Sequence, residues 1–261
     1  MGSSEAAAIV DGTELVLVRH GRTEWNAAGR IQGSGDSPLT SDGVGAAKAL
    51  GWRLARSGRR QPTACYASPL GRAHRTAELI CAQLSEPLVV LAEHALRERS
   101  YGCLEGLTYA EQIAQHPEVH ARNRSGELEY APPGGGESRA EVALRALDAL
   151  TAIARRHPGE RVLVVTHSGL LGIIARRIIG LSAPARSGTL RMPNAAVNLL
   201  RWRDGGWQIA LWGDDGEFSP TLQEGEWLID STVALKLVMR VAAFGAATGL
   251  AGFAIGRLRQ R

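Results

Sequence analysis

Two short apolar runs, each followed at once by histidine, constrain this sequence more than any other feature. Leu15-Val16-Leu17-Val18 leads into Arg19-His20-Gly21, and Val162-Leu163-Val164-Val165 leads into Thr166-His167-Ser168. A short continuous apolar run is typical of a strand that is buried on both faces, as in a parallel sheet. Ligands bind beyond the carboxyl ends of such strands, so His20 and His167 are expected to lie at a ligand site.

Further strands and helices are expected to alternate along residues 13–215. Apolar spacing predicts helices from Thr40 or Ser41 to about Ser57, from Ser68-Pro69 to Leu84, near 109–116, from Ser138 to Arg156, and after His167. Strands are expected at 64–67, at 88–91 and, at a sheet edge, near 196–202 and 207–212, whereas 21–38 is expected to be a loop. This alternation predicts a three-layer α/β/α domain with a mostly parallel central sheet.

Composition excludes several classes of protein. The 261 residues are 44% hydrophobic and 21% charged, which is ordinary for a globular chain. The net charge of +4 comes from arginines scattered among acids, without a basic arm, so we expect no nucleic-acid partner. Cys65, Cys81 and Cys103 form no CxxC pair, and residues 1–12, expected to be a flexible N-terminus, have no signal-peptide pattern. These features favour a cytoplasmic location.

Arg72 and Glu98 add to the chemistry that the two histidines indicate. Guanidinium groups match the geometry of phosphate oxygens, and a neutral imidazole is a competent nucleophile. A glutamate can protonate a departing oxygen and then accept a proton from water. The set fits phosphoryl transfer through a phosphohistidine intermediate, and it lacks the clustered carboxylates of a two-metal phosphatase. We therefore expect neither a metal ion nor a cofactor.

Several motifs occur in a fixed order across most of residues 15–200. They are Leu17-Val18-Arg19-His20-Gly21-Arg22-Thr23-Glu24-Trp25-Asn26, Gly29-Arg30-Ile31-Gln32-Gly33, Asp36-Ser37-Pro38-Leu39-Thr40, Ser68-Pro69-Leu70-Gly71-Arg72-Ala73, Leu96-Arg97-Glu98 with Tyr101-Gly102 and Glu105-Gly106, and Val165-Thr166-His167-Ser168-Gly169. This ordered set resembles the histidine phosphatase superfamily in its phosphoglycerate mutase-like branch. A bare Arg-His-Gly would be weak support for that resemblance, whereas the whole series is strong.

The resemblance implies a role for seven residues. His20 would be the phosphorylated nucleophile. Glu98 would act first as the general acid and then as the base that activates water. The remaining five would hold the transferring phosphoryl group: Arg19, Arg72, His167, Asn26 and Gln32.

The same residues serve phosphatases and mutases, and the variable segment 105–137 favours hydrolysis. Cofactor-dependent mutases of this family carry a longer, lysine-containing insertion, whereas this segment contains no lysine. We therefore expect a phosphatase that acts on a small phosphorylated metabolite. Mutase-type phosphoryl transfer and non-catalytic binding of a phosphorylated ligand stay open as alternatives. The segment is expected to set a specificity that the sequence does not name.

The character of the chain changes after the catalytic region. Residues 216–232 are expected to be a linker and 233–261 an apolar helix with a basic end, within which 241–256 carry no charge. The three terminal arginines argue against a membrane span that begins in the cytoplasm. Residues 233–256 are compatible with packing on the domain, with oligomerisation or with association with a membrane surface.

Overall fold

A computed structural model describes residues 12–181, 190 and 192–216 of the chain. The expected linker from 217 onward, the helix at 233–261 and residues 1–11 lie outside the described residues. Within the described part, no helix is long and apolar enough to cross a membrane.

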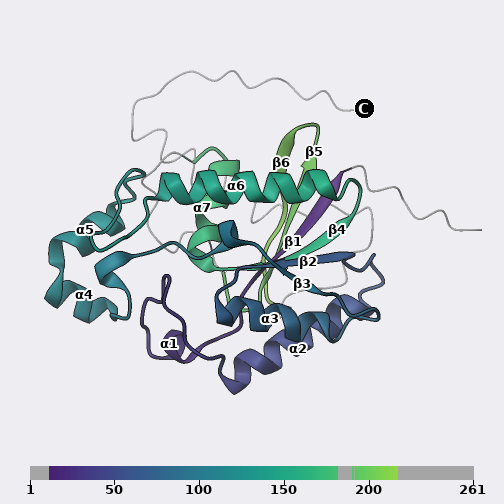
Figure 1. Ribbon diagram of the computed structural model, residues 1–261, viewed down its shortest axis with the longest axis horizontal. Coiled ribbons are helices and arrows are strands. Elements are labelled where there is room, and N and C mark those ends of the chain that lie inside the picture. Colours follow the sequence, from purple (N-terminus) through teal and green to yellow (C-terminus); the bar gives the residue numbers. More distant parts are fainter. Residues whose placement is uncertain (1–11, 182–189, 191, 217–261) are drawn as a thin grey trace, which may run out of the picture. The chain divides into compact units, whose positions relative to one another are not determined.

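Six strands of the described chain form one sheet, in the order β3-β2-β4-β1-β5-β6 (Figure 1). β1 pairs in parallel with β4, and β2 pairs in parallel with both β3 and β4. β5 and β6 form an antiparallel hairpin at one edge. The strand bounds are β1 Thr13–Arg19, β2 Ala64–Ala67, β3 Val90–Ala92, β4 Arg161–Thr166, β5 Val197–Arg203 and β6 Gly206–Asp214. The mostly parallel sheet and the position of these last two strands at its edge are confirmed, and their antiparallel pairing is a finding of the structure.

Two pairs of long helices cover the two faces of this sheet (Figure 1). α2 (Ser41–Arg56) and α3 (Gly71–Cys81) enclose one core together with Val16 and Val18 of β1. α6 (Arg139–Arg156) and α7 (Ser168–Ile178) enclose the other with Leu15 and Leu17. Successive side chains of a strand point to opposite faces, so an unbroken apolar run feeds both cores. The predicted three-layer α/β/α architecture is therefore confirmed.

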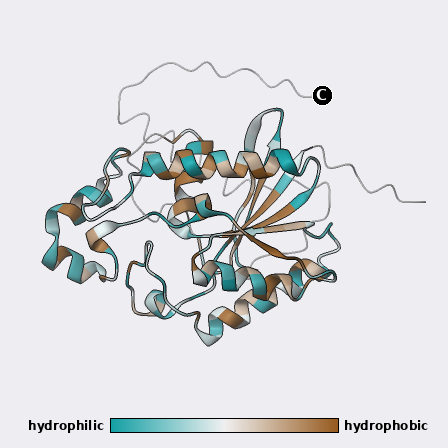
Figure 2. Cartoon of the chain, viewed as in Figure 1, coloured by the Kyte–Doolittle hydropathy of each residue, from teal (hydrophilic) through white to brown (hydrophobic). Residues whose placement is uncertain are grey.

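The long helices are amphipathic, as their alternating hydropathy shows (Figure 2). Of the two expected starts of α2, Thr40 and Ser41, Thr40 is the cap, and its hydroxyl accepts the Gly43 amide. At the start of α6, Ser138 forms a capping box with Glu141. Shorter elements complete the described chain: α1 (Glu24–Ala27), α4 (Tyr109–Gln115), α5 (Pro117–Ser125) and single 3-10 turns at His94–Leu96 and Gly102–Leu104.

Several expected boundaries were wrong, among them one within the segment 21–38 and one at the third strand. The segment 21–38 is not wholly a loop, because Thr23 and Asn26 exchange side-chain-to-backbone bonds in a capping box that starts α1. The third strand occupies Val90–Ala92 rather than 88–91, because its ladder with β2 pairs these residues with Cys65–Ala67. Both differences come from pairings that apolar periodicity does not report.

Candidate active site

The central pair of parallel strands brings the two histidines together. β1 and β4 run in register, with Arg19 opposite Thr166, and the His20 amide donates to the Thr166 carbonyl at 2.9 Å. The imidazole centroids of His20 and His167 lie 5.2 Å apart. Both side chains are buried, at 3% and 0% exposure. The expectation that these strand ends meet is confirmed.

The backbone defines which nitrogen of His20 is available for chemistry. Its Nδ1 lies 2.8 Å from the Gly21 carbonyl oxygen, which can only accept a hydrogen bond. This contact assigns the proton of the neutral ring to Nδ1 and leaves a lone pair on Nε2. Burial, followed by the charges of Arg19 and Arg72, lowers the His20 pKa well below its ordinary value of 6.5. The ring is therefore neutral at neutral pH and suited to nucleophilic attack.

His167 packs against this ring at an interplanar angle of 57°. Its Nε2 lies 2.8 Å from the Ser68 hydroxyl, while its buried Nδ1 has no hydrogen-bond partner within the described chain. Burial, followed by the charge of His20, lowers its pKa well below 6.5. Sequence periodicity placed Ser68 at the start of a helix, but α3 begins at Gly71. The Ser68 hydroxyl instead contacts His167, a role that the sequence did not indicate.

Two arginines, the buried Arg72 and the half-buried Arg19, lie close enough to His20 for their charges to lower its pKa. Nη1 of Arg19 donates to the Met192 carbonyl at 2.7 Å, and the two Nη groups of Arg72 donate to the carbonyls of Gly35 at 2.6 Å and Gly33 at 2.8 Å. The Nε of each is buried without a partner in the described chain. Because buried donors are normally paired, these two are well suited to an anionic ligand.

The Glu98 carboxylate is fixed at the beginning of α7. Its two oxygens accept the backbone amides of Arg99 at 2.9 Å, Gly169 at 2.9 Å and Leu170 at 3.0 Å. A helix N-terminus carries unpaired amides and a positive dipole end, so it orients a carboxylate well. Gly169 is required here, since a Cβ at this position would overlap Oε1 of Glu98 and the Tyr101 hydroxyl.

Amide side chains complete this end of the site. Oδ1 of Asn26 accepts from Nδ2 of Asn194 at 3.2 Å, and the same Nδ2 donates to the His20 carbonyl at 2.9 Å. Oε1 of Gln32 accepts from the Ser37 hydroxyl at 3.1 Å. Asn194 lies far from every motif in the sequence, and only the fold reveals that it links the two predicted residues His20 and Asn26.

A further carboxylate braces the loop that holds Arg72. Oε2 of Glu105 accepts from the Ser34 hydroxyl at 2.7 Å, and Oε1 accepts from the amides of Ser34 at 3.0 Å and Tyr101 at 2.8 Å. The Glu105 side chain also overlaps the position that a Cβ would take at Gly33, whose φ is +55°. Glu105 therefore joins the 33–36 loop to the segment that follows Glu98, a contact that its place in a motif did not specify.

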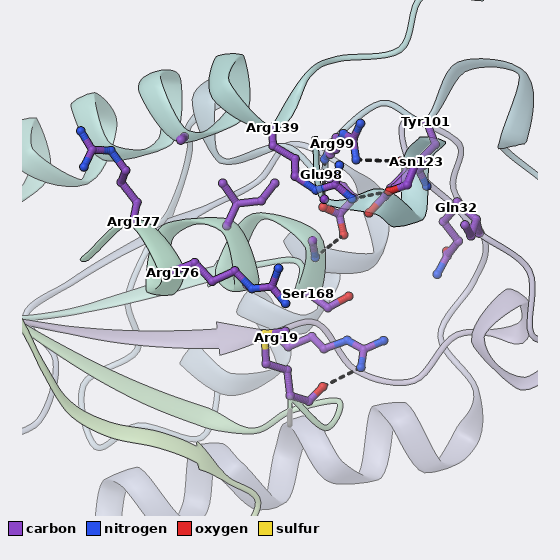
Figure 3. A pocket seen from close by; sticks show the side chains of 18 of the residues that line it. Arg19, Gln32, Glu98, Arg99, Tyr101, Asn123, Arg139, Ser168, Arg176 and Arg177 are labelled. Atoms are coloured by element: carbon purple, nitrogen blue, oxygen red, sulfur yellow. Dashed lines mark hydrogen bonds between the residues drawn. The ribbon is translucent and has the colours of Figure 1, made fainter. Parts of the chain in front are cut away.

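These groups border a single cavity of about 980 Å³ (Figure 3). Six of the seven predicted site residues line it; the seventh, His167, is not among the lining residues, although its ring lies 5.2 Å from that of His20. Within the described chain, eight arginines and three carboxylates line this cavity: Arg19, Arg30, Arg72, Arg99, Arg124, Arg139, Arg176 and Arg177, with Glu98, Glu129 and Asp148. Among the residues that the structure places, no cluster of three or more His, Cys, Asp or Glu side chains is arranged to hold a metal ion. The cavity is therefore suited to an anionic ligand.

Known proteins with similar sequences and folds agree with this geometry. The chain is 42% identical over 215 residues to a metal-independent phosphoserine phosphatase from Arabidopsis thaliana, covering 82% of this chain and 87% of that protein. It is 37% identical over 219 residues to phosphoglycerate mutase-like protein 4 of the same plant, covering 83% and 92%. The solved structure of Bacillus stearothermophilus YhfR superimposes with a TM-score of 0.71 at 32% identity, covering 81% of this chain and all of that one.

The family model of the histidine phosphatase superfamily, branch 1, matches residues 15–215. This range contains both strand-end histidines, Arg19, Arg72, Glu98 and most of the described fold. The chain therefore belongs to branch 1 of the histidine phosphatase superfamily.

Proposed function

We propose that this chain hydrolyses small phosphate monoesters without a metal ion, through a phosphohistidine on His20. The observation that supports this most directly is the neutral His20 ring, whose Nε2 carries a lone pair and whose pKa is lowered by the nearby Arg19 and Arg72. Family membership and the relative named as a metal-independent phosphatase support hydrolysis. Glu98, Arg19 and Arg72, which the proposed reaction would use as its acid and its phosphoryl-binding cations, line one cavity.

In the first step, Nε2 of His20 attacks phosphorus and the bond from phosphorus to the ester oxygen breaks. Glu98, in its protonated form, donates a proton to the departing oxygen. The guanidinium groups of Arg19 and Arg72, together with His167, stabilise the charge on the transferring oxygens. By analogy with lost oxyanion donors, removal of one such group costs on the order of 10²–10³ in rate.

In the second step, water attacks the phosphohistidine and the bond from nitrogen to phosphorus breaks. The Glu98 carboxylate accepts a proton from this water, and inorganic phosphate leaves. The imidazole returns to its neutral state with the Nδ1 proton still held by the Gly21 carbonyl. Because three backbone amides fix Glu98, one carboxyl group serves both steps without moving.

The test is phosphate release from 4-nitrophenyl phosphate in the presence of a chelator. We expect activity to persist with chelator and to be lost in His20→Ala. His74→Ala is the matched control, because His74 also lies near the site in sequence but pairs with Glu78 on the surface of α3. Equal activity in His20→Ala and in the unsubstituted protein would refute the proposal. No activity in any variant would favour a binding module, and exchange of phosphate between positions of phosphoglycerate would favour a mutase.

The cytoplasmic location and the part played by residues 233–256 stay predictions. Fractionation of cells that express the chain with and without residues 231–261 tests both. Recovery of the full chain in the membrane fraction, lost in the shortened chain, would support membrane association. Recovery of both in the soluble fraction would contradict it.

A further inference from the structure

Positive charge in the cavity extends beyond the groups that the proposed phosphoryl site uses. Arg19 and Arg72 surround the reacting histidine, and Arg30 is neutralised by Glu111 at 2.7 Å. Arg139 of α6 and Arg176 of α7 line another part of the cavity wall. Figure 3 shows both side chains directed toward the region of Glu98 and Ser168, whereas Arg177 points away from it.

Arg139 is held in place by neutral groups. Its Nη1 donates to the Glu127 carbonyl at 3.2 Å and its Nη2 donates to the Asn123 carbonyl. Carbonyls orient a guanidinium without cancelling its charge. Three carboxylates line the same cavity, yet within the described chain none lies within 4.0 Å of Arg139. The charge of Arg139 is therefore oriented and not neutralised by a neighbouring acid.

The guanidinium of Arg99 lies near that of Arg139, and both donate to Asn123. Arg99 donates to the Asn123 side-chain oxygen at 2.9 Å and to the carbonyls of Tyr130 and Glu137, all of them neutral acceptors. Burial, and then the charge of Arg99, lowers the pKa of Arg139 to about 10. The charge of Arg176 acts in the same direction. A bound anion would relieve both the burial cost and this repulsion.

We propose that Arg139, together with Arg176, forms a second anion subsite that selects phosphate monoesters carrying another negatively charged group. This rests on the proposed function, since it presumes that a phosphoryl group occupies the site at His20. The second group is a carboxylate or a phosphate, both of which match a guanidinium fork. Monoesters that lack it leave Arg139, which donates to neutral carbonyls in the described chain, without an anionic partner and react less efficiently.

Matched pairs of substrates test the subsite. The first pair is 3-phosphoglycerate, which carries a carboxylate, and glycerol 1-phosphate, which has a hydroxymethyl group in its place. The second pair is propane-1,3-diol bisphosphate and 3-hydroxypropyl phosphate, which differ in the second phosphate. For each pair, the ratio of kcat/KM for the anionic to the uncharged member is measured. A high ratio in one pair alone identifies which anion the subsite takes.

In Arg139→Gln we expect this ratio to fall at least tenfold, with most of the change in KM for the anionic member, and in Arg176→Gln a fall in the same direction. The matched control is Arg60→Gln, because Arg60 also donates to a carbonyl, that of Gly159, but does not line the cavity. Its ratio should stay that of the unsubstituted protein. Arg139→Lys, which keeps the charge but not the fork, should recover part of the ratio.

An unchanged ratio in Arg139→Gln and Arg176→Gln would overturn the subsite, even if His20-dependent hydrolysis of both members persists. Loss of hydrolysis in the unsubstituted protein would instead overturn the proposed function. Arg139 also joins α6 to the end of α5, so the folding of each variant is checked by its thermal midpoint. If Arg139→Gln does not fold, the result for Arg176→Gln decides the proposal.

Discussion

The two buried histidines make the stability of the domain depend on pH in a way that can be calculated. His20 and His167 are each almost fully buried, and burial lowers both pKa values well below 6.5. In the unfolded chain the same rings titrate near 6.5. As pH falls below 6.5, the unfolded state therefore gains protons that the folded state does not bind, and stability decreases.

The size of the effect follows from the number of protons. Each ring that is protonated only in the unfolded state contributes about 1.4 kcal/mol per pH unit, so the two together contribute up to about 2.7 kcal/mol per pH unit. Domains of this kind are stable by only about 5–15 kcal/mol. The slope should be steep below pH 6.5 and absent above it, because both states are then neutral at these positions.

The assay is urea unfolding between pH 5 and 8, followed by the fluorescence of the tryptophans on β5 and β6. The double variant His20→Gln, His167→Gln should lose the slope below pH 6.5. Burial alone would raise the pKa of Glu137, but Arg145 and the Ser100 amide outweigh it and the pKa is lowered overall. Protonation of Glu137 therefore makes stability fall further at lower pH, in the double variant and in the unsubstituted protein alike. Equal slopes for the double variant and the unsubstituted protein between pH 5 and 6.5 would refute the reasoning.

Three further predictions concern the reaction. Gly169→Ala should lower kcat about 10²-fold, the scale of one misplaced catalytic group, because the added Cβ displaces Glu98. The thermal midpoint shows whether the variant still folds, and an unchanged kcat would contradict the placement of the Glu98 carboxylate. Arg19→Gln should move the acid limb of the kcat/KM profile to higher pH, because the positive charge of Arg19 helps to keep His20 unprotonated; a limb that moves lower or stays would count against it. Glu98→Gln should slow hydrolysis of alkyl phosphates far more than formation of the phosphoenzyme from 4-nitrophenyl phosphate, since only the alkyl leaving group needs a proton; equal losses would show that Glu98 is not the acid.

Much of the fold was predictable because the signals are local. The unbroken apolar run of β1 indicates burial on both faces, and the structure places its alternate residues in two separate cores. The sequence placed the start of α2 at Thr40 or Ser41 and that of α6 at about Ser138, and the structure has Thr40 and Ser138 as the two N-caps. The meeting of His20 and His167 followed from a single topological fact, that parallel strands present their carboxyl ends at one edge.

The parts that the sequence did not indicate depend on long-range contacts. Ser68 was interpreted as a helix start, but its hydroxyl contacts a histidine 99 residues further along the chain. Asn194 contacts the His20 carbonyl across 174 residues. In the sequence, Arg139 is one polar residue of an amphipathic helix, and only the fold shows that it lies close enough to Arg99 for that charge to lower its pKa. No local pattern carries such information, because these side chains acquire their partners only when the layers pack.

The central claim is tested most directly by isolating the phosphorylated enzyme. Glu98→Gln is mixed with 4-nitrophenyl phosphate, stopped within milliseconds to seconds in alkaline denaturant, which preserves the bond from nitrogen to phosphorus, and digested for mass spectrometry. We expect phosphate on the imidazole of His20, with one nitrophenol released per enzyme in an initial burst. Nitrophenol release without phosphate on His20, or with phosphate on another residue, would contradict the account.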